Sequence, residues 1–210
     1  WTAMAGDRLA TCVSWIDGVP VGESGVLLGD AAAPLMERMG GLMADLHNTT
    51  DALALPTTTP RHSWDAEGLL GRTALWGRFW ESPATDDAGR ALLIEARDIA
   101  AGRLATLAIG GADYGLIHAD VLRENVLDTG AGLALIDFDD AGWGFRMFDL
   151  GTAMGQNLDE PALPDIAAAL AAGYTARRPL PAAPEDLFLF TALRAFASAG
   201  WILSRTDPQD

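Results

Sequence analysis

Cysteine and basic residues are both scarce in these 210 residues. The single cysteine, Cys12, excludes an internal disulfide bond or a thiolate metal site, and its apolar surroundings (LATCVSWI) predict a buried, reduced thiol. Only 14 Lys and Arg residues oppose 29 Asp and Glu residues, so the formal net charge is −15. A chain of this charge without a basic cluster repels nucleic acid and anionic membranes, and we expect neither as a partner.

Long apolar runs are also missing. No stretch of about 18 uninterrupted apolar residues predicts a membrane span, and no basic, apolar leader opens the sequence. The lack of a predicted membrane span and of a leader, together with a reduced cysteine, favours a cytoplasmic protein. Half of the residues are hydrophobic, enough for a sizeable core in one domain. Because the first residue is Trp1 and not Met, we expect the chain to begin part-way through a longer natural sequence.

Apolar spacing predicts a mainly helical α+β fold. A strand at Arg8–Ile16 ends at the turn Asp17-Gly18, and the strands around Asp128–Gly132 form a buried hairpin. The helices are expected at Ala31–His47, within Ser63–Trp80, at Asp86–Leu107, from Phe148 to Leu158, at Leu163–Tyr174 and at Leu187–Ser204. The apolar face of the helix at Asp86–Leu107 would include Leu92, Leu93, Ala96, Ile99, Ala100 and Leu104. That of the last helix would include Phe188, Leu193, Phe196 and Trp201.

The stretch from Tyr114 to Leu150 concentrates acids beside apolar strands. Desolvating carboxylates in such positions is costly unless cations or hydrogen-bond donors compensate them, so the stretch is a functional candidate. Asp120 is followed five residues later by Asn125 and then, after twelve more, by Asp137. A hairpin between Asn125 and Asp137 would return the chain to its start and bring both oxygen ligands together. This arrangement suits phosphoryl transfer, with Asp120 as base and the other two as Mg²⁺ ligands.

These motifs resemble those of the protein-kinase-like small-molecule phosphotransferases, the superfamily of aminoglycoside phosphotransferases, choline kinases and type II homoserine kinases. Its H-G-D-x-x-x-x-N catalytic loop stands here as HADVLREN, and its I-D-F/W-x-D/E metal segment as IDFDDAG. LATCVSWIDG resembles the last strand and hinge of the family's N-lobe. MGGLMADLHN resembles the first C-lobe helix, and FDLGTAM the helix whose aspartate, here Asp149, braces the catalytic loop.

The resemblance implies ATP and Mg²⁺ as cofactors and a hydroxyl of a small, amine-bearing molecule as acceptor. Residues 1–18 would end the N-lobe, and residues 19–210 would form the helical C-lobe. Catalytic roles fall to His118 and Asp120, and Asp139 joins Asn125 and Asp137 as a metal ligand or supports them. The adenine would lie between hinge and floor residues, namely Ser14, Trp15, Ile16, Leu127 and Ile136.

The sequence departs from the family's pattern at three places. The phosphate loop, the lysine and its glutamate partner of the N-lobe have no counterpart, so the chain alone should bind nucleotide weakly. Ala119 stands where relatives have Gly. Leu122 occupies a position that is often His or Lys, and whether Arg123 supplies that charge is open.

Two other functions stay open. The chain could be a nucleotide-binding pseudokinase module, for which the missing N-lobe and Leu122 argue. It could also be a metal-dependent hydrolase that uses His118 and the acids, although the other histidines, His47 and His62, lie in no ligand-spaced motif. The acceptor and the oligomeric state cannot be read from the sequence.

Overall fold

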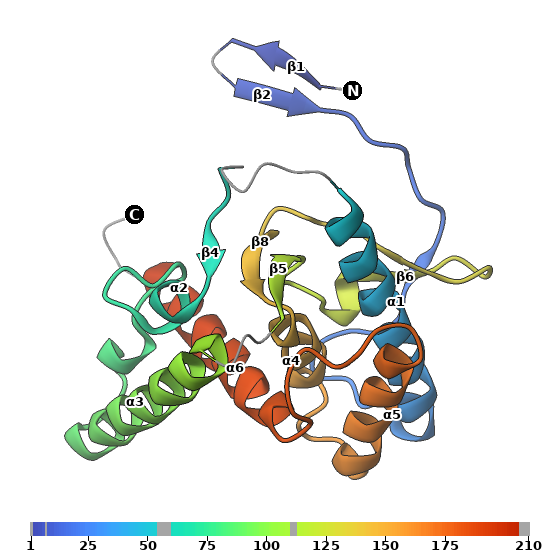
Figure 1. Cartoon of the computed structure of the whole chain (residues 1–210). Coiled ribbons are helices and arrows are strands. Elements are labelled where there is room, and N and C mark those ends of the chain that lie inside the picture. The colour runs from blue at the N-terminus through green and yellow to red at the C-terminus, as the bar shows by residue number, and fades with distance from the viewer. Residues whose placement is uncertain (1, 7, 54–59, 110–112, 206–210) are drawn as a thin grey trace.

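The computed structural model of the chain describes residues 2–6, 8–53, 60–109 and 113–205 (Figure 1). Its helices are α1 (Ala32–Ala52), α2 (Ala66–Leu70), α3 (Asp87–Ile109), α4 (Met147–Gly155), α5 (Leu163–Thr175) and α6 (Asp186–Arg205). Its strands are β1 (Thr2–Ala5), β2 (Arg8–Thr11), β3 (Val19–Pro20), β4 (Ser63–Trp64), β5 (Tyr114–Ile117), β6 (Val126–Asp128), β7 (Leu133–Leu135) and β8 (Gly142–Phe145). Short 3₁₀ helices are η1 (Gly29–Ala31), η2 (Phe79–Glu81) and η3 (Arg123–Asn125). The predicted mainly helical α+β fold is confirmed.

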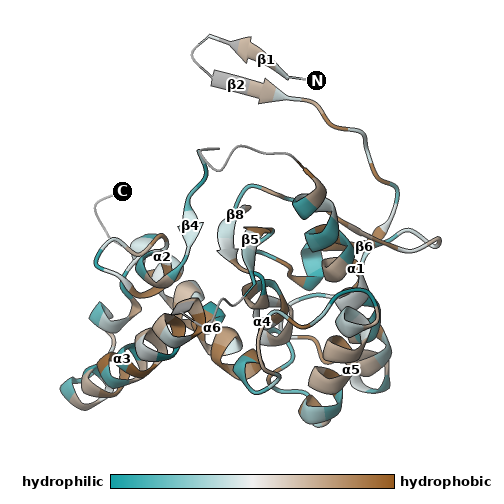
Figure 2. Cartoon of the chain, viewed as in Figure 1, coloured by the Kyte–Doolittle hydropathy of each residue, from teal (hydrophilic) through white to brown (hydrophobic). Residues whose placement is uncertain are grey.

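The N-terminal segment differs from the single strand predicted at Arg8–Ile16. β1 and β2 form an antiparallel hairpin in which Thr2, the first residue of β1, pairs with Thr11, the last residue of β2. Residues 12–18 continue without regular structure, and Figure 2 shows hydrophobic stretches along this linker. Cys12 is exposed, which corrects the predicted buried thiol, because none of the described helices covers the linker. Figure 1 shows the hairpin well away from the helical body.

The predicted helices are present, with shifted ends and partly different buried faces. Asp86 Oδ1 accepts from Gly89 N at 2.7 Å and thus caps α3, as its sequence predicts. The predicted end of α3 at Gly110-Gly111 lies outside the described residues. On α3 Ala100 and Leu104 are buried, whereas Leu92 and Ile99 are exposed, because α3 packs on α2 and η2 along one narrow side. The buried face of α6 likewise excludes Phe188 and Trp201; it comprises Leu187, Phe190, Thr191, Leu193, Arg194, Ala197 and Gly200.

Two small sheets carry the central stretch. The predicted hairpin is confirmed as β6 and β7, joined by a turn in which Thr129 N donates to Gly132 O at 3.0 Å, and β3 pairs with the other edge of β6. β6 is buried and β7 is half-buried. The second sheet, in the order β4-β8-β5, was not predicted. β8 pairs parallel with β4 and antiparallel with β5. It was not predicted because it is short and contains Gly142 and Gly144, and glycine is disfavoured in strands.

Helices α1 and α5 pack closely because glycines meet backbone at the contact. A Cβ at Gly40 would lie 2.2 Å from Leu170 O and 2.8 Å from Tyr174 N. A Cβ at Gly173 would lie 1.9 Å from Glu37 O. Gly40 and Gly173 therefore allow the close approach of the two helices, which brings the end of α1 against Tyr174.

Gly40→Ala should lower the free energy of unfolding by roughly 1–3 kcal/mol, since the new methyl group meets rigid backbone and must push α5 away. Gly102→Ala in α3 is the matched control, because a Cβ there meets nothing within 4 Å. That control should gain roughly 0.5–1 kcal/mol from its better helix propensity. Urea unfolding of both variants measures the difference, and equal stabilities would contradict the packing argument.

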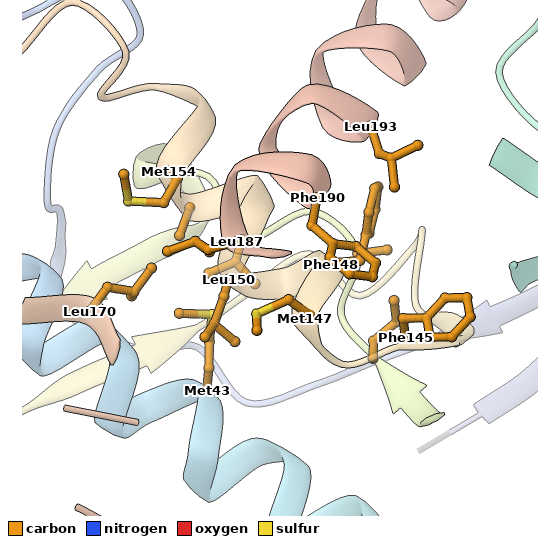
Figure 3. Close-up of a cluster of buried hydrophobic side chains, with 14 of the residues drawn as sticks. Met43, Phe145, Met147, Phe148, Leu150, Met154, Leu170, Leu187, Phe190 and Leu193 are labelled. Carbon is orange, nitrogen blue, oxygen red and sulfur yellow. The ribbon is translucent and has the colours of Figure 1, made fainter. Parts of the chain in front are cut away.

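The core lies where α4 packs against α6 and α1 packs against α5 (Figure 3). Figure 3 shows Phe148 and Leu150 of α4 beside Leu187 and Phe190 of α6. By length and composition alone, α6 could also cross a membrane, a test that core helices of soluble proteins pass as well. Its buried stripe against α4 accounts for its apolar character within this fold.

Candidate active site

The turn after β5 is held by a buried carboxylate. Asp149 Oδ2 accepts from His118 N at 3.0 Å, and Asp149 Oδ1 accepts from Ala119 N at 2.7 Å. Ala119 has a φ of 67°, a left-handed conformation that costs a non-glycine residue energy, which explains why glycine suits this position. The bracing role predicted for Asp149 is confirmed by these two bonds.

His47 completes the brace from the end of α1. Its Nε2 lies 3.0 Å from Asp149 Oδ2, and its Nδ1 lies 2.8 Å from the Tyr174 hydroxyl. Burial by itself raises the pKa of Asp149, but the His47 hydrogen bond, the nearby histidines and the His118 amide outweigh it and hold the pKa below its usual value. His47 therefore belongs to the support of the loop.

Asp120 follows this turn, and both of its carboxylate oxygens accept hydrogen bonds. Its Oδ2 accepts from Asn125 Nδ2 at 2.8 Å, and its Oδ1 accepts from Arg194 Nη2 of α6 at 2.7 Å. Each carboxylate oxygen has a second lone pair, so either can still accept a hydroxyl proton. Burial raises the pKa of the Asp120 carboxyl above its usual value although Arg194 opposes the change, and Asp140 contributes to the rise. A raised pKa makes the carboxylate a better proton acceptor.

His118 has both ring nitrogens in use. Nε2 donates to Ile136 O at 3.0 Å, and Nδ1 accepts from Asp120 N at 3.2 Å. The ring thus ties the loop before Asp120 to the strand end before Asp137. The catalytic role predicted for His118 stays a prediction, and these contacts are those of a positioning residue.

The hairpin brings the predicted metal ligands together. Ile136 N donates to Asn125 O at 3.0 Å, so Asp137 follows directly beside Asn125. Asn125 Nδ2 donates hydrogen bonds to Asp120 O and Oδ2, which leaves Asn125 Oδ1 for a cation. Asp137 is exposed, with a φ of 62°, and Asp139 is exposed in the turn after it.

No group of three or more His, Cys, Asp or Glu side chains that could hold a metal is found in the described part of the chain. Mg²⁺ does not need such a cluster, because it takes one or two protein carboxylates and completes its shell with phosphate oxygens and water. An amide oxygen and an exposed carboxylate therefore fit this ion, and their role as ligands stays a prediction.

The predicted nucleotide residues fall into two groups. Leu127 is buried in β6 and Ile136 is half-buried after β7, next to each other on the hairpin. Ser14, Trp15 and Ile16 are exposed in the linker, where Trp15 Nε1 donates to Asp17 Oδ1 at 3.1 Å. At Gly18, the end of the linker, a Cβ would lie 3.0 Å from Leu127 Cβ, so the linker reaches the hairpin there.

A pocket of about 300 Å³ opens beside Asp120. It is lined by Trp76, Asp120, Leu122, Asp140, Arg194, Ser198, Trp201 and Ile202. The turn at Asp140 is anchored from the β4 side, because Asp140 O accepts from His62 Nε2 at 2.9 Å and from Trp64 Nε1 at 2.8 Å. Arg194 lies over the Trp76 ring and Arg205 over the Trp201 ring, so the Asp140 carboxylate is the lining group suited to an ammonium group.

Arg123 does not supply a charge at Asp120. It is buried, its Nη1 donates to Val26 O, and its Nη2 donates to Asn157 Oδ1 at 2.6 Å. Leu122 lines the pocket with an apolar side chain. The cation beside the Asp120 carboxylate is Arg194, which comes from α6, 74 residues later in the sequence.

Two residues of this site, Arg194 and His47, were missed by the sequence reasoning. Each could have been found from its helical spacing, which places a charged or titratable side chain on the apolar face of a helix. Arg194 lies four residues after Phe190, and His47 lies four after Met43 and eight after Met39. Such residues must find a buried partner, although the sequence does not say which.

Comparison with known proteins agrees with this geometry. The family model described as "Phosphotransferase enzyme family" matches residues 4–186. No curated protein matches the chain at a significant level. A solved microcompartment-associated aminopropanol kinase is similar over all of the chain, with 30% identity and a TM-score of 0.77, and the chain spans 65% of that protein's length.

Two more distant structures share the fold. An amicoumacin kinase, solved with AMP-PNP and Ca²⁺, has 18% identity and a TM-score of 0.62 over 87% of the chain. A choline/ethanolamine kinase family protein from Mesorhizobium loti has 19% identity and a TM-score of 0.59 over 86% of the chain. The chain spans 56% and 57% of their lengths, respectively.

Proposed function

The chain belongs to the phosphotransferase enzyme family, and on that premise we propose that the protein transfers the γ-phosphoryl group of ATP to a hydroxyl of a small amino alcohol. Asp120 accepts the hydroxyl proton and orients the attacking oxygen, which contributes roughly 10²–10⁴-fold to the rate. Asn125 and Asp137 would hold Mg²⁺, which would neutralise charge on the phosphates. Leu127 and Ile136 lie against the base of the nucleotide.

One observation carries the proposal: Asp120 is oriented by two donors at the edge of a pocket of about 300 Å³. A pocket of this size suits a molecule of a few heavy atoms better than a protein segment. The Asp140 carboxylate lines it and favours a cation, in keeping with the net charge of −15. The similarity to an aminopropanol kinase supports the same class of acceptor.

The hydrolase alternative finds little support in the histidines. His118 has both ring nitrogens bonded within the protein, and His47 lies buried between Asp149 and Tyr174. His62 donates its Nε2 to Asp140 O. To bind a metal, His118 or His47 would first have to give up one of these bonds.

The pseudokinase alternative depends on whether the protein has the phosphate loop and the lysine with which a kinase holds the nucleotide phosphates. The gene sequence upstream of the codon for Trp1 distinguishes the two. A glycine-rich loop followed by a strand lysine supports the enzyme, and an upstream coding sequence without them supports the pseudokinase.

A coupled assay of ADP release, run on the complete gene product with Mg²⁺-ATP, tests the function directly. The panel comprises aminopropanol, ethanolamine, choline, homoserine, amino sugars and aminoglycosides. Matched controls are propylamine, which lacks the hydroxyl group, and propanol, which lacks the amine. We expect ADP release only where both groups are present. Release that depends on the hydroxyl alone would contradict the amine preference, and no release with any acceptor would contradict the kinase.

A further inference from the structure

Arg194 is held in place beside Asp120 with hydrogen-bonding capacity left over. Its Nη2 donates to Asp120 Oδ1 at 2.7 Å, and its guanidinium carbon lies 4.6 Å from the centroid of the Trp76 ring. The residue is 7% exposed. Within the described structure its Nη1 is buried and has no hydrogen-bond partner. A buried N–H without an acceptor is unfavourable, so this nitrogen is a candidate ligand-binding atom.

The position of Arg194 places this donor at the reacting centre. An acceptor hydroxyl that reaches Asp120 must also lie in line with the phosphorus atom, so the phosphoryl group passes within a few ångströms of the Asp120 carboxylate. The rigid fork of a guanidinium keeps Nη1 next to the Nη2 that binds Asp120. Arg194 and Asp120 line the same pocket.

Other groups near the loop do not supply this charge. Leu122, two residues after Asp120, is apolar, and the terminal nitrogens of Arg123 are bonded to Val26 O and Asn157 Oδ1. Charge on the oxygens of a phosphoryl group in transfer is stabilised by cations already fixed in place, because no reorganisation is then needed. Arg194 meets that requirement through Asp120 and Trp76.

We propose that Arg194 is a catalytic residue, whose Nη2 orients Asp120 and whose Nη1 donates to an oxygen of the phosphoryl group during its transfer. In this step the acceptor oxygen forms a bond to the γ-phosphorus, and the bond from that phosphorus to the β–γ bridging oxygen breaks. The acceptor proton passes to Asp120, ADP leaves with the bridging oxygen, and Arg194 keeps its charge. The assignment rests on the proposed function and adds a residue to it.

Steady-state kinetics of Arg194→Ala and Arg194→Lys in the complete gene product test the role. We expect the alanine variant to lose roughly 10²–10³-fold in kcat with little change in the KM of the acceptor. Lysine should restore part of the rate as a point charge, and added guanidinium should restore part of it in the alanine variant. The matched control is Arg97→Ala, which removes an arginine 4.4 Å from the Trp80 ring but away from Asp120. It should keep the wild-type kcat.

A binding measurement keeps this test separate from the choice of acceptor. Calorimetry compares Mg²⁺-ADP alone with Mg²⁺-ADP plus aluminium fluoride, which imitates the phosphoryl group in transfer. We expect the wild type to bind the fluoride complex more tightly and Arg194→Ala to lose that gain while binding ADP equally well. If this holds but no acceptor of the panel is phosphorylated, the proposed acceptor class fails, whereas the contact of Arg194 with the phosphoryl group stands.

The assignment is overturned if the alanine variant keeps its kcat, if only the KM of the acceptor rises, or if the fluoride complex binds equally well without the arginine. Thermal unfolding shows whether the alanine variant folds. If it does not, the lysine variant decides: we then expect a lowered kcat and a weakened fluoride complex, and wild-type values for both would overturn the assignment.

Discussion

Asp120→Asn is expected to lower phosphoryl transfer by roughly 10²–10⁴-fold and to leave nucleotide binding nearly unchanged. An amide cannot accept the proton of the acceptor hydroxyl at neutral pH. It also offers one acceptor oxygen where the carboxylate offers two, so either Asn125 Nδ2 or Arg194 Nη2 loses its partner. The groups proposed to contact the nucleotide, on β6 and after β7, are not altered.

The measurement is the rate of ADP release with a reactive acceptor, together with calorimetric titration of Mg²⁺-ADP. Asp128→Asn is a matched control, since Asp128 also binds an arginine, Arg38 at 3.0 Å, but lies in the hairpin turn. We expect that control to keep its activity. Wild-type turnover in Asp120→Asn would remove Asp120 as the base.

Asp149→Asn is expected to lower the free energy of unfolding by roughly 3–5 kcal/mol, because it breaks a fully buried, charge-assisted network. The carboxylate accepts from two backbone amides, of His118 and Ala119, and lies against His47 Nε2. An amide group must direct its own N–H toward at least one of these donors. Since the network holds the turn before Asp120, activity should fall as well.

Thr152→Val is the control on the same helix, since the Thr152 hydroxyl is buried and has no hydrogen-bond partner in the described structure. Removing it should be neutral or stabilising. Urea unfolding compares the two variants, and equal stability of Asp149→Asn and the wild type would refute the brace.

The pH dependence of stability gives an independent check. The pKa of Asp149 is lowered in the folded state, so its contribution is present above the pKa of an unfolded aspartate and is lost as the pH falls through the folded value. The wild type should therefore lose stability in acid more steeply than Asp149→Asn. Parallel curves would show that the carboxylate contributes nothing through its charge.

Parts of the site were predictable because their geometry is local. The Asp128–Gly132 turn and the two short strands around it predict that the chain returns to Asn125 just before Asp137, and the bond from Ile136 N to Asn125 O shows this return. The bracing role of Asp149 followed from the motif. Cys12 was mispredicted for the opposite reason: an apolar neighbourhood in sequence predicts burial only if some other element covers it, and no described helix does.

The helices, the central hairpin, the order of the acids and the family could be predicted from the chain alone, because periodicity, turn chemistry and motif spacing are properties of neighbouring residues. Which cation faces Asp120 depends on how the helices pack. Arg194 reaches Asp120 from 74 positions away through packing of α6 on α4, and His47 reaches Asp149 from 102 positions away through packing of α1 on α4. A buried charged residue must find a partner, but only the packed helices determine which one it meets.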